Sequence, residues 1–140
     1  DGLGDSKDKF KIVAQQDGGA ALDKSMELAE DIITASPDMD AFFCINDPSA
    51  LGAAAAIKAA NKTGKIGVYS IDASPDGKQA LLDDEFTAVA CQVPVQIADY
   101  SFKEAVKYVN GDTKIDEKKV YLDSHLVSKD EAEKTLKEWQ

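Results

Sequence analysis

Apolar positions along this chain gather in short continuous runs, separated by polar stretches and by glycine or proline. Five runs have the length of a β-strand, and they lie at Lys11–Gln16, Ala41–Ile45, Gly67–Ile71, Thr87–Gln92 and Val120–Val127. The run AFFCI at Ala41–Ile45 is apolar throughout, which indicates a strand covered on both faces. The pattern therefore predicts a β-sheet whose strands are spread along the whole sequence.

Segments whose apolar residues recur at helical spacing lie between and after these runs. Helices are expected at Leu22–Ile33, Ser49–Ala60, Gly77–Asp83, Pro94–Asn110 and Asp130–Trp139. Asp47 suits the N-cap of the second helix, and Pro48 suits its first helical position. Strands that alternate with helices favour right-handed crossovers. The prediction is an α/β fold of three layers, doubly wound, with a mostly parallel sheet and helices on both faces.

Composition narrows the class of ligand. The chain has 140 residues, which suffices for one domain and one hydrophobic core. Its net charge of -10 disfavours nucleic acid and anionic membranes as partners. All 16 basic residues are lysines, so the chain offers no bidentate guanidinium for a phosphate or carboxylate. A neutral ligand is therefore expected.

Signals of catalysis, metal binding or a bound cofactor are lacking in the sequence. Cys44 and Cys91 each stand inside an apolar run without CxxC spacing, which is typical of small buried side chains. His125 is the only histidine and lies in the last strand-like run, away from the other polar candidates. No glycine-rich phosphate loop and no nucleophile elbow is present. We therefore expect no enzyme, no metal and no cofactor.

Polar side chains stand where three successive strands are expected to end. Asn46 follows the second predicted strand, Asp72 follows the third, and Gln92 ends the fourth. Asparagine and aspartate also favour turns, which offers a purely structural explanation for two of the three. Ligands of open parallel sheets bind at the carboxyl ends of the strands. Two amides and one carboxylate at that edge match the donors and acceptors of sugar hydroxyls.

A known family resembles this chain in three stretches, FFCINDPSALGAAAAIKAA, GVYSIDASPDGKQAL and TAVACQVP. These are similar to the C-terminal lobe of ribose-type periplasmic binding proteins, whose wider family includes the ligand-binding halves of lac-repressor-type regulators. The resemblance implies a type I lobe of flavodoxin-like strand order, hinged to a second α/β lobe, with a sugar trapped between them. It also implies that Asn46, Asp72 and Gln92 hydrogen-bond the sugar.

Departures from the family pattern lead to further expectations. The family often has an aromatic residue where Ala20 stands, so the resemblance implies a ligand site at Ala20 suited to a larger or differently shaped sugar. The motif ending in Asp1-Gly2-Leu3 implies that the first strand and the N-terminal lobe lie upstream of residue 1. Segment 94–118 is then expected to pack on that lobe. The strands that contain Cys44 and Cys91 would not be neighbours, which predicts that both thiols are free. Because the first strand would be missing, the sheet is expected to be completed by another chain.

Two classes of function remain open at this point. The first is a secreted solute-binding protein, periplasmic or extracellular and in one form lipid-anchored, that captures a neutral monosaccharide or polyol. It would close around the sugar and deliver it to the membrane permease of an ABC transporter. The second is an extracellular sugar-sensing domain of a signalling receptor, or the effector-binding domain of a lac-repressor-type regulator. A repressor would carry a helix-turn-helix, which is not visible in this sequence.

Overall fold

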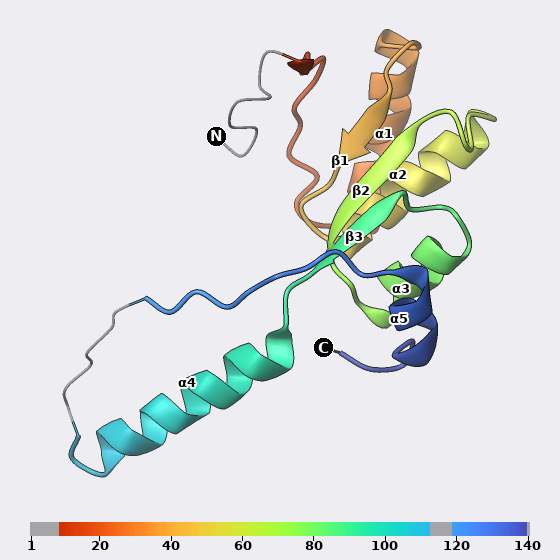
Figure 1. Ribbon diagram of the computed structural model, residues 1–140. Coiled ribbons are helices and arrows are strands. Elements are labelled where there is room, and N and C mark those ends of the chain that lie inside the picture. The colour runs from red at the N-terminus through yellow and green to blue at the C-terminus, as the bar shows by residue number, and fades with distance from the viewer. Residues whose placement is uncertain (1–8, 113–118, 140) are drawn as a thin grey trace.

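A computed structural model describes residues 9–112 and 119–139 of the chain (Figure 1). The segments at Asp1–Leu3 and 113–118, which entered the sequence predictions, lie outside the described residues. The elements follow one another as α1 (Leu22–Ala35), β1 (Ala41–Phe43), α2 (Asp47–Ala59), β2 (Gly67–Asp72), α3 (Pro75–Leu82), β3 (Ala88–Cys91), α4 (Pro94–Val109) and α5 (Lys129–Lys134).

The three strands form one parallel sheet in the order β1-β2-β3. Phe43 pairs with Tyr69, and Tyr69 in turn pairs with Ala88, so these residues share one face of the sheet. Each strand is joined to the next through a helix, α2 or α3, as parallel neighbours require. The predicted α/β fold with a parallel sheet and helices is confirmed, and it puts all three strand ends on one edge.

Helix starts at this edge are set by side-chain caps. The Asn46 side chain accepts a hydrogen bond from the Ser49 amide at 3.1 Å and so caps α2. The prediction that Asp47 is the cap is wrong by one residue, because Asp47 already has its place inside the helix. Ser74 caps α3 in the same way, by accepting from the Gly77 amide at 3.0 Å.

The two faces of the sheet differ in their burial. On one face Val68, Val89 and Cys91 are almost completely buried, and α2 and α3 lie against the strands. On the other face Phe43 is 75% exposed and Tyr69 is 42% exposed. Figure 1 shows α1, α2, α3 and α5 gathered on the same side of the sheet. The core of the described residues therefore lies between the sheet and this group of helices.

Close packing within that group depends on small residues. A Cβ atom placed on Gly52 of α2 would lie 2.4 Å from the carbonyl oxygen of Leu22 and 2.8 Å from the amide of Met26, both in α1. Such a Cβ could not be accommodated unless the two helices moved apart. The run of alanines after Gly52 has the same effect against the sheet, since short side chains let α2 approach β1 and β2 closely.

Helix α4 points away from the other elements (Figure 1). It ends at Val109, one residue before the predicted end at Asn110, which is the C-cap. None of its residues is buried, although Val95, Phe102, Val106 and Val109 recur on one side of it. An amphipathic helix normally buries such a stripe against another element, so α4 carries an apolar surface without a partner among the described residues.

Two predicted strands are not formed. Residues 11–17 are exposed and have no regular structure, so the strand predicted at Lys11–Gln16 is wrong. The run Val120–Val127 makes one antiparallel bridge, between Leu126 and Ala90, instead of a strand. A strand needs a hydrogen-bonding neighbour along its length, and local apolar composition does not supply one. The last helix also ends at Lys134 and does not continue to Trp139.

Cys44 and Cys91 are both buried free thiols, as predicted. β2 lies between their strands in the sheet order. Burial raises the pKa of the Cys44 thiol to about 11. A buried thiol with a raised pKa is unreactive, which fits a role in packing.

Candidate functional site

The ends of β2 and β3 bring two of the predicted site residues into direct contact. The Gln92 side-chain amide donates a hydrogen bond to Oδ1 of Asp72 at 2.8 Å. Asp72 is half-buried and Gln92 is exposed, so both side chains reach the surface at this edge. The pair presents a carboxylate that can accept further hydrogen bonds and an amide that can both donate and accept.

Asn46 lies near the pair of Asp72 and Gln92, because the next residue, Asp47, contacts Asp72. The backbone amide of Asp47 donates to Oδ2 of Asp72 at 3.4 Å. The side-chain amide of Asn46 donates to the carbonyl oxygen of Ala20 at 3.3 Å. Ala20 itself is exposed and precedes α1. The predicted residues therefore form two hydrogen-bonded pairs, Asn46 with Ala20 and Asp72 with Gln92, and the backbone of Asp47 connects the pairs at one end of the sheet.

Backbone conformations at this edge are unusual. Four residues that are not glycine have positive φ angles here: Ala20 (56°), Asp72 (129°), Ala73 (57°) and Val93 (48°). Side chains with a Cβ adopt this region at a cost, and β-branched valine does so very rarely. Such strained residues gather at ligand sites, where the surrounding structure holds them in place. The strain thus marks the same edge as the polar side chains do.

Asp47 is a residue of this edge whose role the sequence did not reveal. Its carboxylate is buried and accepts hydrogen bonds from the Ser70 hydroxyl at 2.6 Å, from the Ser74 amide at 2.8 Å and from the Ser74 hydroxyl at 2.6 Å. It therefore ties the turn after β1 to β2 and to the turn after β2. The only signal in the sequence is a helix-start motif, which predicts a cap and not a buried network.

The pKa of Asp72 is raised above its ordinary value. Burial is the largest cause, because it disfavours the charged form of the carboxyl group. The hydrogen bond from the Asp47 amide lowers the pKa, and the negative charge of Asp47 raises it. A partly desolvated carboxylate gains from hydrogen-bond donors, and the hydroxyls of a sugar are donors of this kind.

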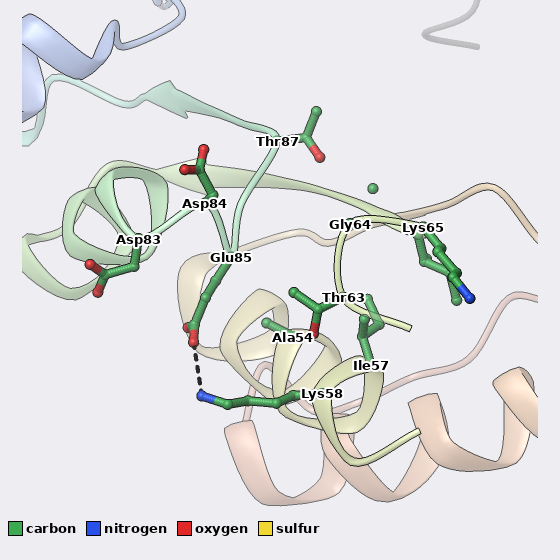
Figure 2. Close-up of a pocket in the computed structure, with 12 residues that line it drawn as sticks. Ala54, Ile57, Lys58, Thr63, Gly64, Lys65, Asp83, Asp84, Glu85 and Thr87 are labelled. Atoms are coloured by element: carbon green, nitrogen blue, oxygen red, sulfur yellow. Dashed lines mark hydrogen bonds and ion pairs between the residues drawn. The ribbon is translucent and has the colours of Figure 1, made fainter. Parts of the chain in front are cut away.

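A pocket of about 310 Å³ lies at the other end of the strands. It is lined in part by Gly67 at the start of β2 and by Thr87 just before β3. Figure 2 shows the ion pair between Lys58 and Glu85, at 3.5 Å, on one side of this pocket, and Lys65 on the other. Its charged groups are exposed except for Glu85, which is half-buried, and they do not point toward a common centre. The pocket is therefore separate from the edge that carries the predicted site residues.

Other features of the described chain add no second site. Across residues 9–112 and 119–139, no three metal-ligating side chains come together. Within the same ranges no helix has both the length and the apolar character needed to cross a bilayer. The His125 side chain forms an exposed pair with Glu131 at 2.8 Å. Its carbonyl oxygen accepts a hydrogen bond from the amide of Cys91 at 2.8 Å, so its backbone lies beside the end of β3, contrary to the prediction that it lies away from the strand ends.

Comparison with known proteins identifies the family. A model described as "Periplasmic binding protein domain" matches residues 1–113. The ribose import binding protein of Salmonella typhimurium is 34% identical over 104 residues, which is 74% of this chain and 35% of the relative. The chain thus spans about a third of the length of that relative.

Two solved structures with the same fold were determined for proteins that bind sugars. A periplasmic solute-binding protein of an ABC transporter from Actinobacillus succinogenes, with bound D-allose, superposes with a TM-score of 0.81 at 25% identity, over 89% of this chain and 43% of that one. A galactofuranose-binding protein gives a TM-score of 0.81 at 32% identity, over 90% and 44%. The chain belongs to the periplasmic binding protein domain family, and its relatives are the ribose-type sugar-binding proteins.

Proposed function

We propose that this chain is the C-terminal lobe of a solute-binding protein that captures a neutral monosaccharide or polyol. The observation that carries the proposal is the contact between Asp72 and Gln92, at 2.8 Å, on an edge where Asn46 also stands. The fold and the relatives point to the same class of ligand, since the relatives named above bind ribose, allose and galactofuranose.

The chemistry of the edge suits hydroxyl groups. Each sugar hydroxyl both donates and accepts a hydrogen bond. The Asp72 carboxylate accepts from hydroxyls, and the side-chain amides of Asn46 and Gln92 donate to them and accept from them. The chain has no arginine with which to pair an anionic group on the ligand. Ala20 leaves one side of the site without a large side chain, which favours a ligand larger than those held against an aromatic ring.

A second lobe would complete the site. The sheet edge is open to solvent, and sugar-binding sites of high affinity enclose most of the ligand surface. The apolar stripe of α4, with Phe102 and Val109 exposed, supports packing of the segment 94–118 on that lobe. Closure of two lobes around the sugar would then be driven by contacts that exist only in the closed state.

Delivery of the captured sugar to an ABC importer follows from the relatives. The solute-binding protein with bound D-allose belongs to an ABC transporter, and the Salmonella relative is an import protein. We propose the same role here, outside the cytoplasmic membrane, with the permease as the partner. Attachment to the cell surface through a lipid anchor is one form of this proposal.

Isothermal titration calorimetry of the full-length protein tests the ligand class. The ligands are D-ribose, D-allose, D-galactose and myo-inositol, with citrate as an anionic comparison. Asn46→Ala, Asp72→Ala and Gln92→Ala should each weaken binding of the preferred sugar by about 10- to 100-fold, because each leaves a buried polar group of the complex unpaired.

The matched control is Gln79→Ala, which removes an exposed side-chain amide of α3 away from the edge. It should leave sugar affinity unchanged. The proposal fails if none of the sugars or polyols binds, or if all three site variants bind as tightly as the parent protein.

A further inference from the structure

Asp47 is buried, and among the residues that the structure describes no cationic side chain is within hydrogen-bonding distance of its carboxylate. Only 1% of its surface is exposed, and its two carboxylate oxygens accept three hydrogen bonds, two from hydroxyls and one from a backbone amide. Gly77 borders it so closely that a Cβ atom there would lie 2.1 Å from Oδ2 of Asp47. Burial of a carboxylate costs free energy unless its oxygens accept hydrogen bonds. The Asp47 carboxylate therefore restrains the Ser70 and Ser74 groups that donate to it.

The partners of Asp47 stand on both sides of the strained part of the edge. Ser70 lies two residues before Asp72, and Ser74 lies one residue after Ala73. Both serines bind the Asp47 carboxylate, while Asp72 and Ala73 between them have positive φ angles. The carboxylate therefore holds the two ends of the segment 70–74 whose middle residues are strained.

Asp47 also contacts the Asp72 side chain directly. Its backbone amide donates to Oδ2 of Asp72 at 3.4 Å, while Gln92 donates to Oδ1 at 2.8 Å. One residue thus restrains both the backbone and the carboxylate of Asp72. Asp47 itself is sealed on the helix-covered side of the sheet, where Ser70 is buried too, and so it does not reach the surface on which a ligand would lie.

We propose that Asp47 is a positioning residue for sugar binding, which acts through Asp72 and makes no contact with the ligand. The proposal rests on the proposed function of Asp72 as a ligand-binding group. Without the Asp47 carboxylate, the turn after β2 relaxes toward an unstrained conformation. The Asp72 carboxylate then changes its orientation and no longer faces Gln92 and the sugar. Asn46 keeps its own contact with Ala20, so the loss is confined to the Asp72 part of the site.

A double-mutant cycle on the full-length protein separates this role from general stabilisation. The affinity of the tightest-binding member of D-ribose, D-allose and myo-inositol is measured by calorimetry for Asp47→Ala, Asp72→Asn and the double variant. Asp47→Ala should weaken binding by about 10-fold or more alone, and should have little further effect once Asp72 is already Asn. Effects that simply add would overturn the proposal.

Variants with smaller changes test the same proposal if Asp47→Ala does not fold. Ser70→Ala removes one of the three hydrogen bonds and should give a smaller loss of the same kind. Asp47→Asn keeps an oxygen for the Ser74 amide and should restore part of the affinity lost in Asp47→Ala. Asp76→Asn, which removes an exposed charge from the first turn of α3, is the matched control and should bind as the parent does.

A readout without ligand distinguishes failure of this proposal from failure of the proposed function. The titration of the Asp72 carboxyl group is followed by NMR in the parent protein and in Asp47→Asn. That variant keeps the backbone amide but removes the negative charge that raises the Asp72 pKa, so the titration should move to lower pH. An unchanged titration overturns the role of Asp47. If none of the sugars binds although the titration moves, the proposed function fails and the coupling of Asp47 to Asp72 stands.

Discussion

Replacement of Gly77 by alanine sets two effects of opposite sign against each other. Gly77 lies in α3, and alanine is favoured over glycine inside a helix by about 1 kcal/mol. The added Cβ would stand 2.1 Å from Oδ2 and 2.4 Å from Cγ of Asp47, which no real contact tolerates. The carboxylate or the helix must therefore move.

The cost of that movement follows from what the carboxylate holds. Hydrogen bonds to a charged group contribute about 1.5–3 kcal/mol each, and overpacking of a well-filled interior costs about 1–3 kcal/mol. If one of the Asp47 bonds to Ser70 or Ser74 is lost, the clash outweighs the gain in helix propensity. Gly77→Ala should lower the free energy of unfolding by about 2–4 kcal/mol.

Equilibrium urea denaturation followed by far-UV circular dichroism measures this loss, since the midpoint shifts at constant slope when stability alone changes. Gln79→Ala, at an exposed position of the same helix, is the control and should change the free energy of unfolding by less than about 0.5 kcal/mol. A midpoint for Gly77→Ala equal to or above that of the parent would refute the close approach of α3 to Asp47.

Four further outcomes are expected. Lys78→Met should destabilise the C-terminal segment, because the fully buried ammonium donates to the carbonyl oxygens of Thr135 and Glu138, and hydrogen exchange of the Thr135 amide should quicken. Sugar affinity, measured by calorimetry, should decline as pH falls, and begin to do so above the pH at which an ordinary aspartate titrates, since the Asp72 pKa is raised. The Asp72 carboxyl group binds its proton more tightly in the folded state than in the unfolded state, so its contribution to stability is lost as pH rises through its folded pKa. Asp72→Asn should therefore have a higher free energy of unfolding than the parent at neutral pH. Cys44, with its pKa raised to about 11, should not react with a thiol reagent at pH 8 until the protein is unfolded in urea.

Local sequence determined the elements that need no distant partner. The helical stripe from Leu22 to Ile33 lies in α1. The apolar runs AFFCI and TAVACQ contain β1 and β3, and GVYSI covers all of β2 except its last residue, Asp72. Because each strand is followed by a helix, the three strand ends fall on one edge, which is why Asp72 and Gln92 could be singled out together. Their hydrogen bond agrees with that inference.

Local sequence failed where a partner from elsewhere in the chain decides the structure. Lys11–Gln16 has the composition of a strand but remains without regular structure, and Val120–Val127 forms one bridge, because pairing of strands is a property of both partners. Lys78 looks like a surface residue in the sequence. It is completely buried because the C-terminal segment brings three oxygen atoms to its ammonium group.

The sequence by itself determined the class of fold and the polar side chains that stand where the parallel strands end, which is the edge that we propose as the ligand site. Only the tertiary structure decided that Asp47 is a buried anchor for Ser70 and Ser74, and that Asp72 is held in a strained conformation between them. The reason is physical: periodicity and strand ends are encoded by neighbours in the chain. The burial of a charge and the strain of a turn depend on groups more than twenty residues apart that meet only when the sheet is assembled.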